Sequence, residues 1–227
     1  MTSKLLAGAF GALMAISAHS TPLITFTDNA PSSVVTASLN DVSVNLAVSW
    51  TQTVASSNVT LSALLQENGG SAANWYVTTA VGAGTTAAQV VYSGTYLAPP
   101  PAGSTDLNFN GDPRTVLGAG LNFAAGTYFL VLDGPAGQFF NSAEWVGDFL
   151  SRLSINLASG YSVGGYMATL APDPFAPGST FSTAGLGRFG LVFELESVAQ
   201  QVPVAPTLPL VALGLLALAV VRKREAM

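Results

Sequence analysis

The most chemically specific spacing in the sequence is a run of oxygen-bearing side chains at alternate positions near the middle of the chain. In chain order these residues are Asp106, Asn108, Asn110 and Asp112. Alternate oxygen ligands, with Gly111 for the sharp turn, form the first half of a calcium-binding loop. A full EF-hand loop ends on Glu at the position of Leu117. The run therefore predicts either a calcium site or a plain turn, because Asn, Asp and Gly also favour turns.

Two pairs of carboxylates are the other candidates for chemistry. Glu144 with Asp148, or Glu194 with Glu196, would provide the acid and base of a glycosidase if they faced each other across a groove. The alternation around Glu194 and Glu196 instead places both on the solvent side of a strand, where acids keep a sheet edge soluble.

The middle of the chain lacks the residue types that most catalytic sites use. The only histidine is His19, the only lysines are Lys4 and Lys223, and there is no cysteine. Ser-His-Asp and Cys-His sites, Schiff-base lysines and zinc sites with His or Cys ligands are therefore excluded from that region. We expect a domain that is not an enzyme and has no cofactor apart from the calcium alternative.

The composition is that of a folded, nearly uncharged domain. Charged residues make up 8% of the chain, against about 25% in average soluble proteins, and Val, Leu and aromatic residues are too frequent for disorder. Between residues 21 and 203, three arginines stand against eleven acids, a net charge of −8. We expect no nucleic-acid partner, because phosphates demand clustered Lys and Arg.

The first twenty residues have the three parts of a secretory signal peptide. Lys4 is positive, residues 5–18 are mostly apolar, and Ala18 and Ser20 are small residues before a cut at Thr21. The alternatives are an N-terminal membrane anchor and a buried helix, but the apolar run is shorter than the ~20 residues that span a bilayer. We therefore expect export by the Sec machinery.

The last residues combine a proline box, an apolar segment and a basic stub. Prolines in residues 203–209 keep the chain extended, because proline fixes φ and restricts the residue before it. Residues 208–221 are uncharged and, counted back to Val204, would form a helix of about 27 Å, close to the ~30 Å core of a bilayer. A buried core helix is one alternative, although it would show a polar face. A GPI-type tail is the other, although it would end without a basic triplet.

These features of the C-terminus resemble the PEP-CTERM class of sorting signals, especially its VPLPA-like variants. The matching positions are Val202, Pro203, Ala205, Pro206, Gly214, Arg222, Lys223 and Arg224. The commonest form has Glu where Val204 stands, and the order of Ala205 and Pro206 is swapped relative to VPLPA. The resemblance implies processing by an exosortase in a Gram-negative bacterium that produces exopolysaccharide and biofilm.

The expected organisation has three parts. A signal peptide covers residues 1–20, an extracellular β-rich domain covers 21–200, and the sorting signal covers 201–227, with a transmembrane helix at 208–221 that the basic stub holds in the inner membrane. The protein would then reach the cell surface or the medium as a structural or interaction protein of the extracellular matrix. The alternatives are a lectin-like domain that stacks Trp75, Tyr76 or Tyr92 on exopolysaccharide, and a carboxylate glycosidase.

The middle of the chain has the alternation of β-strands. Residues 42–50 read VSVNLAVSW, which places Leu46, Val48 and Trp50 on one side and Ala47 on the other. Similar segments recur at 59–65, 75–79, 89–92, 127–132, 153–157 and 189–196. They predict an all-β fold, an antiparallel sandwich or jelly roll flanked by helices at both chain ends. One segment, residues 141–153, also fits a short helix capped by Asn141.

Overall fold

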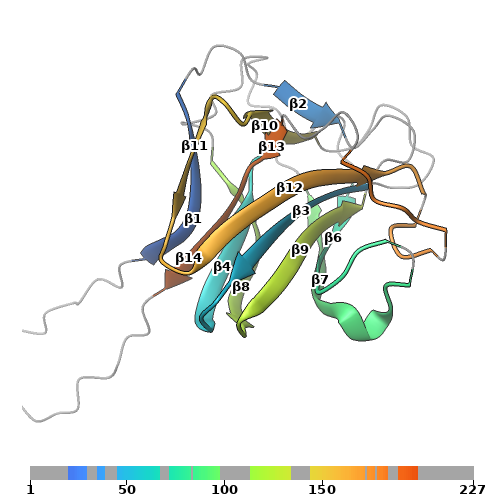
Figure 1. The fold of residues 1–227 in the computed structure, drawn as a ribbon, viewed down its shortest axis with the longest axis horizontal. Helices are drawn as coiled ribbons and strands as arrows, with labels where there is room; N and C mark the ends of the chain where they lie inside the picture. Colours follow the sequence, from blue (N-terminus) through green and yellow to red (C-terminus); the bar gives the residue numbers. More distant parts are fainter. Residues whose placement is uncertain are drawn as a thin grey trace, which may run out of the picture. The chain divides into compact units, whose positions relative to one another are not determined.

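The computed structural model shows a domain built from β-strands (Figure 1). It describes residues 20–29, 35–38, 45–66, 72–82, 84–97, 113–133, 144–171, 173–176, 178–183 and 189–198. All of them belong to the compact unit His19–Ala199, which is distinct from residues 1–18 and 200–227. Within these described ranges there is no α-helix, and the one helical element is the 3-10 turn η1, Ala87–Gln89.

The described residues form two five-stranded sheets and a smaller third sheet, and all ladders among them are antiparallel. The first sheet contains, in spatial order, β11 (Leu153–Leu157), β1 (Ser20–Asp28), β14 (Phe193–Val198), β4 (Ser56–Ala63) and β8 (Thr115–Phe123). The second contains β12 (Tyr161–Thr169), β3 (Asn45–Gln52), β9 (Gly126–Asp133), β6 (Ala72–Thr78) and β7 (Val90–Leu97). The third contains β13 (Phe189–Leu191), β10 (Glu144–Phe149) and β2 (Val35–Ser38), and β5 (Leu65–Gln66) also pairs with β10.

The prediction of an all-β antiparallel fold is confirmed, and the two predicted terminal helices lie outside the described residues. Without β11 and β12, the spatial order is β1-β14-β4-β8 in the first sheet and β3-β9-β6-β7 in the second. Chain neighbours such as β3 and β4, or β8 and β9, therefore lie in opposite sheets, which is the connectivity of a jelly roll. β11 and β12 widen the two sheets beside β1 and β3.

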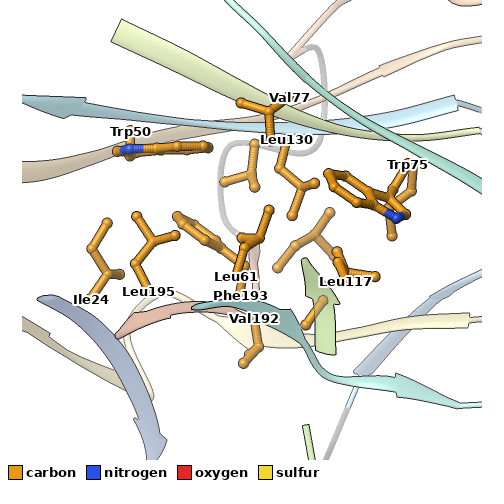
Figure 2. Close-up of a cluster of buried hydrophobic side chains, with 14 of the residues drawn as sticks. Ile24, Trp50, Leu61, Trp75, Val77, Leu117, Leu130, Val192, Phe193 and Leu195 are labelled. Atoms are coloured by element: carbon orange, nitrogen blue, oxygen red, sulfur yellow. The ribbon is translucent and has the colours of Figure 1, made fainter. Parts of the chain in front are cut away.

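The core lies between the first and second sheets. Trp50 of β3 is fully buried, and its ring centroid lies 5.4 Å from that of Tyr128 in the same sheet and 5.6 Å from that of Phe193 in the opposite sheet. Figure 2 shows side chains of the two sheets facing each other, with Trp50, Val77 and Leu130 opposite Ile24, Leu61, Phe193 and Leu195. Burial of each large apolar side chain contributes roughly 1.5–3 kcal/mol, so this layer joins the two sheets.

The predicted helix at residues 141–153 is wrong, because residues 144–149 form strand β10. β10 is the central strand of the third sheet, so its backbone groups pair with β2 on one side and with β5 and β13 on the other. At Gly147 the backbone carbonyl of Gly190 approaches so closely that a Cβ would collide with it. The buried indole of Trp145 donates a hydrogen bond to the carbonyl oxygen of Val192 at 2.8 Å. Pairing with strands that are distant in the sequence therefore makes residues 144–149 a strand instead of a helix.

The two ends of this sandwich differ in what they carry. We call the end where β1 begins and β14 ends the near end; it holds the turns at residues 53–55, 124–125 and 158–160 (Figure 1, lower left). The opposite end, here called the far end, holds the third sheet and the far tips of β9 and β12. Both chain ends of the described domain therefore leave from the near end.

Candidate functional site

Most of the predicted functional residues lie outside the described residues. These are Ala18, the calcium candidates Asp106, Asn108, Asn110 and Asp112, and the sorting residues Val202, Pro203, Ala205, Pro206, Gly214, Arg222, Lys223 and Arg224. In the part of the chain that the structure describes, no helix is long and apolar enough to cross a membrane. Within the same part, no three His, Cys, Asp or Glu side chains are grouped so that they could hold a metal ion.

The two described candidates, Ser20 and Thr21, open strand β1 at the near end. Ser20 is the register partner of Val198, and Thr21 is the partner of Ser197. The predicted signal-peptide cut therefore falls at the first residues of the first strand, while β14 ends at Val198, four residues before the proline box begins at Val202. The structure thus brings the two chain ends of the domain together, and we take this junction as the candidate site.

Asn58 fastens the end of β14 at this junction. Its side-chain Nδ2 donates to the carbonyl oxygen of Val198 at 2.9 Å, and its backbone N–H donates to Oδ1 of Asn122 at 3.2 Å. Its φ of +53° lies in the left-handed region, the one such value for a non-glycine residue in the described ranges; Asn tolerates this region better than most residues. Sequence reasoning missed this role, although an Asn inside an apolar strand is a signal for an irregularity.

A buried amide closes the near end. The side chain of Gln52 is 1% exposed, and its Oε1 accepts a hydrogen bond from the indole N–H of Trp50 at 3.3 Å. Its Nε2 lies within hydrogen-bonding distance of the carbonyl oxygens of Val54 and Phe123, at 2.9 and 3.4 Å, and of Oγ of Ser56 at 3.1 Å. The turn after β3 and the end of β8 are therefore held by neutral hydrogen bonds.

Each of the two carboxylate pairs lies along a single strand. Glu144 and Asp148 lie along the single strand β10, where a four-residue separation places the backbone positions about 13 Å apart. Glu194 and Glu196 lie on the outer face of β14, as the alternation predicts, with Phe193 and Leu195 buried on the inner face. Oε1 of Glu194 accepts a hydrogen bond from Nε of Arg114 at 3.0 Å, and both side chains are 15% exposed.

The prediction that Trp75 is exposed for stacking on a sugar is wrong. Trp75 is 5% exposed and lies in the core with Val77 (Figure 2), and a Cβ at Gly94 would lie 2.6 Å from its indole nitrogen. The backbone of edge strand β7 therefore covers the indole, a contact that only pairing of β6 with β7 creates.

The two tyrosines of that prediction are half-buried and already in contact with the protein. The Tyr76 ring centroid lies 4.9 Å from that of Phe175, edge to face. The hydroxyl of Tyr92 accepts a hydrogen bond from the backbone N–H of Asn122 at 2.9 Å and donates one to its carbonyl oxygen at 2.8 Å. These contacts bind Tyr92 to edge strand β8, and so neither ring lies free on the surface.

The described part of the far end contains an acid with a shifted pKa. Asp133 lies at the tip of β9 within 3.5 Å of Nδ2 of Asn74. The pKa of Asp133 is raised to about 6, chiefly by burial and to a smaller extent by the charge of Asp173, while the hydrogen bond from the Asn74 amide lowers it. Burial, followed by the charges of Asp133 and Asp173, raises the pKa of Tyr76 as well. The far end therefore changes its charge between mildly acidic and neutral pH.

Comparison of the chain with protein-family models, with curated proteins and with solved structures gave no match in any of the three.

Proposed function

We propose that the chain is an exported protein of the bacterial cell surface or extracellular matrix that is held in the inner membrane by residues 208–221 and then processed by an exosortase-type enzyme. The sequences of the two chain ends carry the proposal. A signal peptide ending at Ser20 starts translocation, and the basic triplet at residues 222–224 stops it.

The pairing of β1 with β14 supports this proposal. Because Ser20 and Val198 are register partners, the two targeting segments continue from neighbouring strands at one end of the sandwich. A cut before Thr21 removes one register pair and leaves the rest of the β1–β14 ladder. A cut in the proline box lies beyond the last strand. Both processing steps are therefore compatible with a domain that is already folded.

We further propose that the folded domain is a structural or interaction module rather than an enzyme. The chain between the two targeting segments contains no His, Lys or Cys. The carboxylate pairs of the described strands lie along single strands, and Glu194 is engaged by Arg114. The exopolysaccharide matrix is the partner that the PEP-CTERM resemblance implies.

Mass spectrometry of the mature protein from its native host tests the proposal at both ends. We expect an N-terminus at Thr21 and a C-terminus upstream of residue 208, which would show that both segments had been removed. A surface-located protein that still contains residues 1–20 or the stub at 222–227 would contradict it.

Replacement of the basic triplet tests the sorting step separately. Changing Arg222, Lys223 and Arg224 to Gln removes the stop-transfer charge, so we expect weaker membrane retention and less processed product. Glu225→Gln alters the charge of the adjacent position by one unit and is the matched control. Unchanged fractionation and unchanged mature mass in the triple variant would count against processing at this tail.

A further inference from the structure

Charge is unevenly distributed between the two ends of the described domain. The near-end turns at residues 53–55, 124–125 and 158–160 contain no charged residue. Most described charged residues lie toward the far end: Asp28, Arg114, Asp133, Arg152, Asp173 and Glu194. The acid closest to Val198 among the described residues is Glu196, on the outer face of β14 opposite Pro22 and Thr60. The described residues include seven acids and two arginines, a net charge of −5, and all of these except Glu196 lie toward the far end.

The near-end surface, defined as residues 53–55, 124–125 and 157–160, exposes small and apolar side chains. Val54 is 50% exposed and Leu157 is 43% exposed, and the alanines at 55, 124 and 125 are exposed beside them. The backbone of these turns already has partners within the domain. Thr53 N–H donates to the Gly160 carbonyl oxygen at 2.9 Å, and the Tyr128 hydroxyl donates to that of Ala124 at 3.0 Å. This surface can therefore meet an apolar phase without leaving those groups unsatisfied.

The chain that follows β14 limits how far the near end can be from a membrane. Nine residues lie between Val198 and the start of the predicted span at 208, and even when fully extended the ten steps from 198 to 208 reach only about 35 Å. This is comparable with the length of the eight- and nine-residue strands of the sandwich, about 30 Å at the usual rise. The tether therefore holds the near end at a high local concentration beside the bilayer, where a weak contact is enough.

Contact with a bilayer is energetically more favourable for the near end than for the far end. Anionic lipids create a negative surface potential that repels acids within about a Debye length, and apolar side chains gain free energy when they enter the interface. We propose that the near-end surface lies against the outer surface of the bilayer while the C-terminal tail is in the membrane, with the far end and its acids directed away. This inference rests on the proposed function, because it requires the tail to be inserted.

Single cysteines test the orientation, because the chain has none of its own. Val54→Cys reports on the near end and Val116→Cys on the far end, and the two valines are similarly exposed, at 50% and 58%. The full chain is reconstituted in vesicles of phosphatidylethanolamine and phosphatidylglycerol that contain a headgroup-nitroxide lipid, and each cysteine carries the same fluorophore. We expect loss of fluorescence at position 54 and none at position 116.

Flotation with the vesicles separates the two proposals. If the full chain does not float, the tail does not insert, and both the proposed function and the inference fail. If it floats but position 116 is quenched as strongly as position 54, the inference alone is overturned.

A charge variant tests whether the apolar contact is the cause. With the fluorophore at Ala125→Cys, we expect Val54→Asp to abolish the quenching and the matched change Val116→Asp to leave it unchanged. Equal quenching in the two Asp variants would also overturn the inference. Both substituted valines are solvent-exposed, so neither change disturbs the core.

Discussion

The near end and the far end of the sandwich are stabilised by different kinds of polar contact. At the near end, the buried amide of Gln52 joins Trp50 to the turn after β3, and Asn58 holds the last residue of β14. At the far end, Arg114 pairs with Glu194, and Asp133 lies against Asn74. Amide hydrogen bonds do not titrate, whereas carboxylates do. The comparison therefore assigns the pH and salt response of the described domain to its far end.

The largest effect is expected at Gln52. Gln52→Leu keeps a similar volume but removes the partner of the Trp50 indole N–H and the amide donor to the neighbouring turn. Buried groups left without partners cost about 1–3 kcal/mol each, so we expect the free energy of unfolding to fall by about 2–4 kcal/mol. Because no charge is involved, urea denaturation should give the same loss at pH 5 and pH 8.

The control for Gln52→Leu is Gln52→Glu, which has the same shape and a carboxyl group. Burial disfavours the charged form, so the loss for this variant should grow as the pH rises. A pH-dependent loss in the Leu variant itself would contradict the view that the near end is held by neutral contacts.

A smaller effect is expected at Asn58. Asn58→Gly keeps access to positive φ but loses the bond to the Val198 carbonyl oxygen, so about 1 kcal/mol should be lost. Asn58→Val loses the bond and also strains a β-branched residue at φ > 0, for a total of about 2–3 kcal/mol. Hydrogen exchange of the β14 amides measures where the loss appears. If the two variants lose the same free energy of unfolding, the positive φ at position 58 costs a β-branched residue no stability.

The alternation of apolar and polar residues predicts which segments are strands, but only in part which side chains are buried. The period of two in residues 42–50 correctly predicted that Leu46, Val48 and Trp50 face the core. It also placed Ala47 on the solvent side, yet Ala47 is fully buried, as is its register partner Val131. The outer face of the second sheet is covered by segments that are distant in the sequence. One of their contacts is the hydrogen bond of 2.7 Å that Nδ2 of Asn45 donates to the Ala171 carbonyl oxygen. No local pattern contains that information.

The candidate site also has features that the local sequence predicts and features that only the fold reveals. The composition of the chain ends predicts the targeting segments directly, because charge and apolar length are local properties. The pairing of Ser20 with Val198 and the role of Asn58 depend on residues about 140 to 180 positions apart. Trp75 illustrates the opposite error, since it was predicted to be exposed, but its burial depends on the glycine at position 94 in the next strand. Sequence therefore predicts what the ends carry, and the fold decides where they meet.

At the far end, Asp133 should give the domain a pH dependence. Its pKa in the folded state is about 6, above the ordinary value of 3.8, so its contribution is most favourable below about pH 4 and is lost as the pH rises through 6. Asp133→Asn should therefore leave stability unchanged near pH 3.5 and raise it at pH 7 by about 1 kcal/mol, a value reduced for the partial solvent exposure of this group. Thermal unfolding of both proteins across this pH range measures the difference.

A second variant identifies the cause of that shift. Asp173→Asn removes the nearby charge that raises the Asp133 pKa but leaves the burial that is its main cause. We therefore expect the pH-dependent difference to move to slightly lower pH without disappearing. A melting-temperature difference between Asp133→Asn and the parent that stays constant from pH 3.5 to 7 would exclude Asp133 as the titrating group.

The smallest effect is expected from the ion pair of Arg114 and Glu194. A double-mutant cycle with Arg114→Gln and Glu194→Gln isolates their coupling, which should be about 0.5–1 kcal/mol because both side chains are 15% exposed. Salt screens partly exposed charges, so the coupling should fall between 0.05 and 1 M salt, while the loss in Gln52→Leu should not. If the coupling stays constant over that range, the pair behaves like the neutral contacts of the near end. The contrast between the two ends would then rest on Asp133 alone.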